Sequence, residues 1–291
     1  MLVFSDARPR WGCSVAEGLT VNGVPLDSYA YLVTDVSGLM VGASRRGENV
    51  VVPGRHGRIR SVNKKFDSVD VVLPMWVNGS LPDGSIPVDS DARVEWFRRR
   101  DELLRILYAD PLVLEFTRPD GHAVNTTAEV VESVAFERAG VQPEAQVSVA
   151  LTLNEPFWQD SVSVSQTVTG PSGTVQALTA FEGATSPMSD LLITVVGPCS
   201  NPLFTHGDRW VKYNGVIAAG RQLVLNTENW RATAGTGSTW SPDIRQVEYS
   251  GAGTGWFELD PTIAPFDVTF THTGGGSASA TLAGRRRYLV P

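Results

Sequence analysis

The fold is decided by the stretch VSVALTLNEPFW, residues 147–158. Four apolar residues between Val147 and Leu153 alternate with small or polar ones, and a period of two places them all on one face of a β-strand. The strand is expected to end at Asn154–Trp158, because proline cannot donate a hydrogen bond to a sheet. This half-buried strand closes a first domain near residue 160.

The region upstream of that stretch predicts a sheet with one helix. Val69, Val71 and Leu73 repeat the alternation, and Asn78-Gly79 is a strong turn signal. A further β-rich patch at 29–34 precedes this strand, and strands at 112–116 and 123–136 follow the helical segment. Strands, one helix and strands again indicate a mainly β or α+β first domain.

The sequence predicts an α-helix over residues 91–109. Asp89-Ser90-Asp91 offers capping groups and negative charge at the positive end of the helix dipole. Asp110-Pro111 ends the helix, since the residue before proline avoids helical geometry. The expected core face is formed by apolar residues at helical spacing, which are Val94, Phe97, Leu104 and Leu107.

Downstream of residue 160 the chain is expected to be all β. Short β-rich segments alternate with turns such as Asn214-Gly215, which is typical of a β-sandwich. The predicted domains are therefore 1–160 and 161–291. The strands predicted in the second domain are 162–168, 175–181, 190–196, 210–213, 222–226, 245–249, 255–259, 266–271 and 277–283.

Composition and charge narrow the function. The 291 residues include 28 glycines and 18 prolines, a composition that favours short strands and turns. The net charge of −7 disfavours a protein that binds along the DNA backbone. The N-terminal residues lack the apolar core of a signal peptide, and no stretch approaches the ~20 apolar residues of a membrane span. Synthesis in a cytoplasm is expected, with no membrane insertion. Cys13 and Cys199 are interpreted as free thiols.

Motifs for catalysis are missing from the sequence. The four histidines have no second metal ligand at zinc-site spacing, and no nucleophile elbow, phosphate loop or dinucleotide motif occurs. We predict a protein without enzymatic activity, cofactor or metal. One alternative, a hydrolase, would need paired carboxylates. The candidates Asp243, Glu248, Glu258 and Asp260 are interpreted instead as solvated or interface charges.

The second alternative is a carbohydrate-binding module that uses aromatic side chains of residues 161–291. Trp230 and Trp240 are its candidate residues, forming an aromatic surface for a glycan or a partner. Sugar binding by the second domain alone would favour this hypothesis, whereas self-assembly of the full chain would favour a structural role.

Several segments resemble the distal tail protein family of long-tailed bacteriophages, which are minor tail proteins. Residues 155–160, EPFWQD, resemble the family's exit from the first domain, and Val196–Pro202 is similar to its valine-glycine-x-x-x-asparagine-proline segment. The order and spacing of the motifs carry the resemblance together. The other matching segments are 55–58, 211–215, 219–227, 256–261, 266–270 and 287–289.

The resemblance implies a fold and a task. The first domain would be a tail-tube-like β-barrel or sandwich with one helix, and the second a galectin-like β-sandwich. Six copies would form a ring in the phage tail of the virion, between the tail tube protein and the tail tip. Hub or tape-measure and receptor-binding proteins would dock on the far side, and DNA would pass through the channel without specific binding.

Arginines of the first domain are the candidate ring-interface residues. Arg55 and Arg58 flank a basic turn, and Arg98 and Arg99 lie on the predicted helix. Their planar guanidinium groups suit carboxylates, so we expect them to pair with acidic residues between subunits or within the ring. A closed ring would also pair strand edges between subunits.

Overall fold

The computed structural model forms two compact units, and each is described by itself. The first comprises Met1–Arg46, Lys65–Trp158 and Val290–Pro291, and the second comprises Gly47–Lys64 and Gln159–Leu289. The structure describes residues 18–28, 30–46, 50–51, 58–59, 65–79, 81, 85, 87–138, 144–236, 239–250, 257–274 and 278–291.

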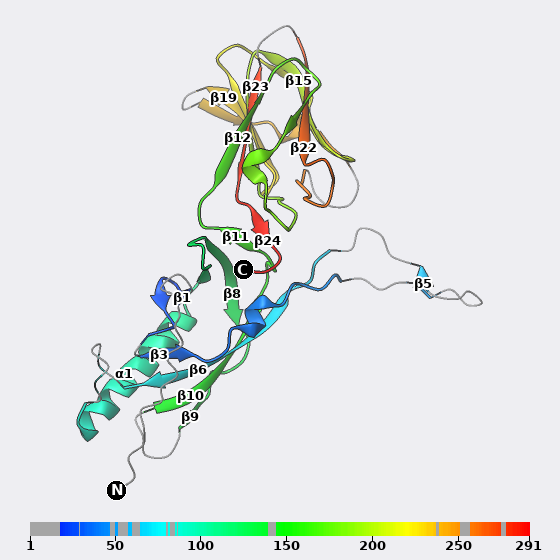
Figure 1. The fold of residues 1–291 in the computed structure, drawn as a ribbon. Helices are drawn as coiled ribbons and strands as arrows, with labels where there is room; N and C mark the ends of the chain where they lie inside the picture. The colour runs from blue at the N-terminus through cyan, green and yellow to red at the C-terminus, as the bar shows by residue number, and fades with distance from the viewer. Residues whose placement is uncertain are drawn as a thin grey trace. The chain divides into compact units, whose positions relative to one another are not determined.

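The first unit is built on an antiparallel sheet with the strand order β2-β1-β7-β8-β10-β6-β3 (Figure 1). The pair of β10 with β6 runs over ten residues of each strand, from Glu144 opposite Asn78 to Leu153 opposite Val69. β10 buries alternate residues, as the period of two predicts. The strands are β1 (Gly18–Val21), β2 (Val24–Pro25), β3 (Tyr31–Val33), β6 (Val69–Asn78), β7 (Leu112–Thr117), β8 (Ala123–Val130), β9 (Phe136–Arg138) and β10 (Glu144–Leu153), with β9 paired to β10.

The sheet of the first unit nearly closes into a barrel. Its two terminal strands meet, because Asp27 bridges Leu32 and the backbone N–H of Val33 donates to the carbonyl of Leu26 at 3.2 Å. Closure within the subunit satisfies backbone groups that an open edge would expose. The residues that follow β2, Leu26 and Asp27, are therefore bonded to β3, and these backbone groups are not free for the expected pairing between subunits.

Helix α1 (Asp89–Leu107) lies where the sequence predicts a helix, but its boundaries differ by two residues. The N-cap position is occupied by Val88, whose side chain cannot accept a hydrogen bond. Asp89, Ser90 and Asp91 therefore lie within the first turn instead of capping it. Leu107 is the last helical residue, and Asp110-Pro111 follows as expected.

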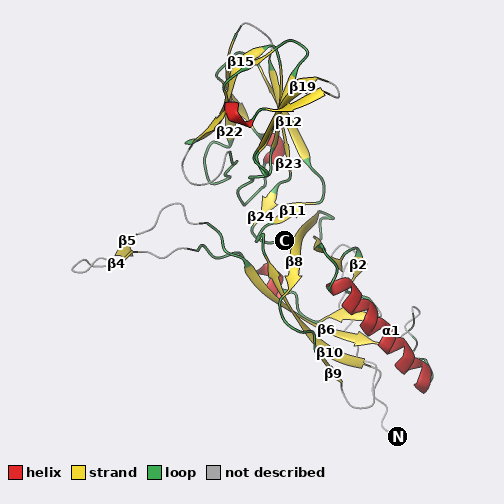
Figure 2. Cartoon of the chain, turned by 180° about the vertical axis from the view of Figure 1, so that it is seen from behind, coloured by secondary structure: helices red, strands yellow, loops and turns green. Residues whose placement is uncertain are grey.

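The second unit is a sandwich of two antiparallel sheets (Figure 2). One sheet has the order β12-β23-β14-β18-β19-β20, and the other has β13-β22-β15-β16-β21 with β17 paired to β15. The strands are β12 (Val164–Thr169), β13 (Thr174–Ala177), β14 (Leu192–Val196), β15 (Cys199–His206), β16 (Arg209–Tyr213), β17 (Val216–Ile217), β18 (Gln222–Asn226), β19 (Arg231–Thr236), β20 (Thr239–Pro242), β21 (Val247–Tyr249), β22 (Asp267–Thr273) and β23 (Ser279–Gly284).

The apolar residues of the two facing sheets form one core. Phe204 and Phe270 stack within it with ring centroids 4.9 Å apart, and Phe181 is fully buried in the same core. Cys199 is a buried free thiol, and burial raises its pKa. Cys13 lies outside the described residues. The prediction of a mainly β fold is confirmed, and α1 is the only α-helix in the part of the chain that is described.

Several predicted features of the second domain need correction. Residues 257–258 of the predicted strand 255–259 are not in a strand, and residues 245–246 of the predicted strand 245–249 lie in a 3₁₀ turn (Ile244–Gln246). The segment 175–181 is not one strand, because β13 ends at Ala177 and a 3₁₀ turn (η2, Thr179–Phe181) carries Phe181 into the core. The sequence pattern does not predict β15, which contains Pro202. The structure accommodates this proline where the pairing of β15 with β22 shifts register, between Ser200 and Leu203.

Short elements complete the description. β4 (Val50–Val51) pairs with β5 (Arg58–Ile59) in a two-stranded ribbon, and β11 (Trp158–Asp160) pairs with β24 (Arg287–Tyr288). The 3₁₀ turns η1 (Ser37–Met40) and η3 (Ile244–Gln246) lie in the first and second units. Among the described helices, none has the length and apolar composition required to cross a membrane.

Candidate functional site

Helix α1 turns one regular apolar stripe toward the interior of the first unit. The stripe recurs at steps of three and four residues, which is the helical period. Trp96 meets Phe136 edge to face, with ring centroids 6.4 Å apart. The buried residues of the stripe are Ala92, Trp96, Arg99, Leu103, Ile106 and Leu107.

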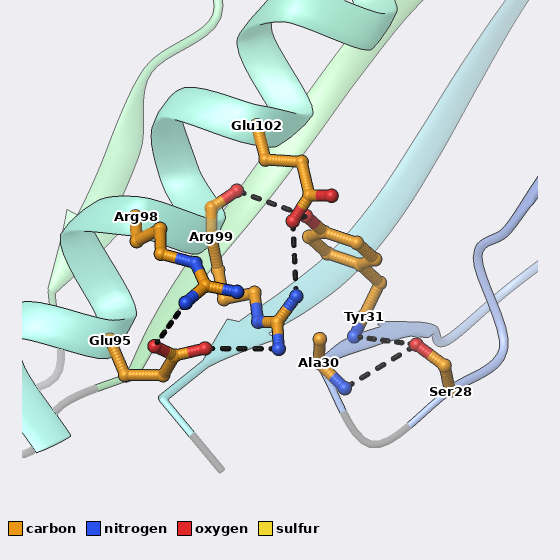
Figure 3. A network of polar contacts seen from close by, with 7 residues as sticks. All are labelled: Ser28, Ala30, Tyr31, Glu95, Arg98, Arg99 and Glu102. Atoms are coloured by element: carbon orange, nitrogen blue, oxygen red, sulfur yellow. Dashed lines mark hydrogen bonds and ion pairs between the residues drawn. The ribbon is translucent and has the colours of Figure 1, made fainter. Parts of the chain in front are cut away.

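Arg99 lies in the middle of this buried stripe and is compensated within its own chain (Figure 3). Its guanidinium contacts Glu95 Oε1 at 2.9 Å and Glu102 Oε2 at 3.0 Å. The hydroxyl of Tyr31 lies 3.1 Å from the Arg99 carbonyl and 3.2 Å from Glu102 Oε2, so it can donate to either. Two carboxylates therefore balance one buried cation, and the network ties α1 to strand β3.

The turn before β3 orients Tyr31 toward this network. Ser28 Oγ accepts hydrogen bonds from the backbone N–H groups of Ala30 and Tyr31, both at 3.3 Å (Figure 3). A serine at this position mimics a backbone turn. The sequence gives no sign that Tyr31 and Glu102, 71 residues apart, come together.

The opposite side of α1 exposes a second apolar group. Val94, Phe97 and Tyr108 are exposed by 68%, 45% and 59%. The predicted core face is therefore wrong for Val94 and Phe97, because Trp96 and Leu103 on the other side of the helix take the interior instead. Leu107 is buried as predicted, and Leu104 is partly buried.

Charges of both signs surround the exposed apolar group. Arg98 lies 3.5 Å from Glu95 with 68% of its side chain exposed, whereas the Arg100 guanidinium contacts Asp101 at 2.6 Å. The same Arg100 group lies 4.9 Å from the centroid of the Phe97 ring, a cation–π distance. The outer face of α1 thus combines apolar contacts with both signs of charge.

The other predicted site residues lie elsewhere. Arg55 is outside the described residues, and Arg58 lies in β5, where only the backbone is described. The ring-interface role of these two arginines stays a prediction. Trp230 is 48% exposed at the turn between β18 and β19, and Trp240 lies in β20, where only its backbone is described.

Each carboxylate considered for hydrolysis contacts a basic or hydroxyl side chain within the second unit. Arg209 forms an ion pair with Glu258 and a second one, at 3.3 Å, with Asp260. Asp243 accepts a hydrogen bond from the Tyr213 hydroxyl, and burial together with this contact raises the pKa of Tyr213 to about 12. Glu248 lies 3.8 Å from the Lys212 ammonium. This arrangement gives each carboxylate a structural partner.

A buried acidic group joins the first and last strands of the second unit. Asp160 accepts a hydrogen bond from Arg286 Nε at 2.6 Å and another from the Tyr288 hydroxyl at 2.9 Å. Burial disfavours the charged form of Arg286, but the hydrogen bond and charge of Asp160 outweigh it and raise the pKa of that guanidinium. Arg287 pairs with Asp190 at 3.2 Å. Two arginines of the run near the C-terminus, Arg286 and Arg287, are therefore salt-bridged.

No group of three or more histidine, cysteine, aspartate or glutamate side chains in the described part of the chain could hold a metal ion. The chemistry of the described polar clusters is that of ion pairs and hydrogen bonds within each unit.

Comparison with known proteins identifies a shared fold. No family model matches the sequence, and no curated protein is similar enough in sequence to be matched. Among solved structures, the Dit protein of phage SPP1 is similar with a TM-score of 0.61 at 14% identity, over 92% of this chain and 98% of that one. Its structure is described as a paradigm of the hub adsorption apparatus in phages that infect Gram-positive bacteria.

Two structures of the phage p2 baseplate in its activated conformation, with strontium and with calcium, also match. Their TM-scores are 0.43 and 0.39, each at 7% identity. The matches cover 92% and 83% of this chain and 98% and 87% of those chains.

Proposed function

We propose that this protein is a structural, non-enzymatic component of a bacteriophage tail tip. The observation that carries the proposal is the likeness to the SPP1 Dit fold, which extends over both units and nearly the full length of that chain. A fold can host many functions, so the likeness alone supports a class of assembly. The ordered motifs that resemble distal tail proteins support the same class from the sequence.

The finer proposal is a hexameric ring between the tail tube and the tail tip of the virion. The tail tube protein would bind one side, and hub or tape-measure and receptor-binding proteins the other. The net charge of −7 supports a channel through which DNA passes, because each neutralised phosphate would add salt-dependent affinity and slow its movement.

The ring contact is proposed to use the outer face of α1 instead of strand edges. The residues after β2 bond to β3, whereas Val94, Phe97 and Tyr108 leave apolar area in water. Burying such groups against a second copy is favourable by about 25 cal/mol per Å² of apolar surface. Arg98 and Asp101, exposed beside them, give a neighbouring copy charges of both signs to pair with.

The experiment is a mass measurement of the purified full chain combined with electron-microscopic class averages of tail tips. We expect six-fold rings. The double variant Val94→Asp/Phe97→Asp should remain monomeric with an unchanged circular dichroism spectrum, because both side chains are exposed in the folded chain. Val175→Asp is the matched control and should still assemble, because Val175 is an exposed apolar residue, at 58%, that lies in the second unit.

The ring and its proposed contact are contradicted by different results. A strict monomer or a three-fold fibre in the intact particle would contradict the ring. Full assembly of the Val94→Asp/Phe97→Asp variant would reject α1 as the contact while leaving the ring itself in place.

DNA passage is tested separately. A mobility-shift assay with duplex DNA at physiological salt should show nothing tighter than the ~10⁻⁴–10⁻⁶ M of nonspecific contact. Nanomolar, salt-sensitive binding by the assembled ring would overturn the role as a conduit.

A further inference from the structure

Two exposed aromatic rings meet between the two sheets of the second unit. Trp230 ends the turn between β18 and β19 in one sheet, and Tyr249 is the last residue of β21 in the other. Their ring centroids are 5.7 Å apart with planes at 80°. Trp230 is 48% exposed and Tyr249 is 40% exposed. The sequence singles out Trp230, but only the fold brings Tyr249 to it.

The turn that carries Trp230 is firmly anchored. Asn226 Oδ1 accepts hydrogen bonds from the backbone N–H groups of Glu228 and Asn229 at 3.1 and 3.2 Å. The buried Thr227 hydroxyl accepts a bond from the Leu191 N–H at 2.9 Å. These contacts hold the base of the turn, so the ring at its end is presented in a defined place.

The backbone of Trp230 is in the left-handed region, with φ of 58°. A bulky residue rarely adopts this conformation, and the turn would accept glycine or asparagine with less strain. Strained residues of this kind cluster at binding sites, where the surrounding structure enforces them. The fold therefore holds Trp230 in an unfavourable backbone conformation while its aromatic ring stays half exposed, as expected of a binding residue.

The size and the surroundings of the pair indicate the class of ligand. About half of two aromatic side chains amounts to roughly 200 Å² of exposed ring surface. A stable protein partner would need about 800 Å² on this side, so the pair is small for protein docking. Glu228, Asn229 and Arg231, exposed beside Trp230, supply hydrogen-bonding groups.

A sugar ring matches this surface, because it has an apolar C–H face for stacking and hydroxyl groups at its edge. The net charge of −7 and Glu228 disfavour a phosphate backbone, so nucleic-acid stacking fits less well. We propose that Trp230 and Tyr249 form a glycan-stacking site, with bacterial surface saccharide as its ligand class. The proposal is independent of ring assembly.

The test is a titration of the full-length protein with oligosaccharides of glucose, galactose and N-acetylglucosamine, followed by NMR of the tryptophan indole N–H groups. We expect one of these saccharides to shift the Trp230 resonance, which the Trp230→Asn variant identifies by its loss. Asparagine tolerates positive φ and removes the ring, so this variant should fold. Trp230→Asn and Tyr249→Ala should each weaken binding by about tenfold or more, as loss of a stacking ring does.

Val175→Ala, an exposed apolar truncation on β13, is the matched control and should bind as the native chain does. The proposal is overturned if no saccharide of the panel moves the Trp230 resonance, or if Trp230→Asn binds with unchanged affinity. It is also overturned if Trp230 is protected from oxidative footprinting in the assembled tail tip by a neighbouring protein, which would make the ring pair a protein contact.

Discussion

Replacing Arg99 by methionine should destabilise the first unit far more than the same change at its neighbour Arg98. Arg99 is 11% exposed and contacts Glu95 and Glu102, whereas Arg98 is 68% exposed and has one ion pair at 3.5 Å. Methionine keeps helix propensity and fills the site with apolar atoms. The variant therefore removes the cation and leaves two carboxylates without it.

The magnitude follows from the burial of the three charges. Breaking a buried pair by removing one partner costs about 3–5 kcal/mol. The Glu102 side chain is 33% exposed, so water screens part of this cost, and about 3 kcal/mol is expected. For a unit of this size that corresponds to a fall in Tm of roughly 6–12 °C. Arg98→Met should cost less than about 0.5 kcal/mol.

The assay combines thermal unfolding by circular dichroism with hydrogen exchange of the α1 amides, because two units need not unfold together. Removing the carboxylates as well, in Glu95→Gln/Arg99→Met/Glu102→Gln, should recover most of the loss, since apolar and neutral groups can replace a buried ion triad. Equal stability of Arg99→Met and Arg98→Met would refute the network as a stabilising element. If the triple variant does not regain the stability lost in Arg99→Met, the loss arises from side-chain packing instead of from unpaired charge.

Three further predictions concern the second unit. The fragment 159–291 should unfold cooperatively and show a β-type circular dichroism spectrum. Its free energy of unfolding in urea should exceed that of the fragment 161–291 by about 2–3 kcal/mol, because the shorter fragment lacks Asp160. Equal unfolding midpoints of the two fragments would contradict this. The folded pKa of Tyr213, about 12, exceeds the unfolded value near 10, so its contribution to stability is complete below about pH 10 and lost as pH rises toward 12; Tyr213→Phe should flatten that decline in alkaline denaturation curves. Burial raises the pKa of Cys199, so a thiol reagent at pH 8 should modify it only after unfolding, and rapid labelling of the folded chain by mass spectrometry would show the site to be open.

Periodic patterns explain what could be predicted about the fold. The alternation in 147–153 and in 69–77 gives β10 and β6, because a period of two is a local property of the strand. The position of α1 follows from the acidic start and the proline that ends it. The segment 222–226 matches β18, since it lies between clear turn signals. These features need no knowledge of distant contacts.

The face of α1 that becomes buried could not be predicted. Val94 and Phe97 fit a helical apolar face as well as Trp96 and Leu103 do, so the hydrophobic pattern contains two overlapping stripes. The choice depends on Tyr31 in β3, which reaches across 71 positions to Glu102 beside the buried Arg99. A charged residue in the buried stripe is acceptable only once that partner is in place.

The sequence by itself determined a mainly β chain with one helix and singled out Trp230, because composition, period and turn residues act locally. Tertiary structure alone decided which cations form ion pairs within the subunit and which aromatic ring contacts Trp230. Arg99 is compensated by Glu95 and Glu102, and Tyr249 reaches Trp230 from the facing sheet. Both outcomes depend on strand order and helix rotation, which arise from packing between segments far apart in the chain and leave no local signature.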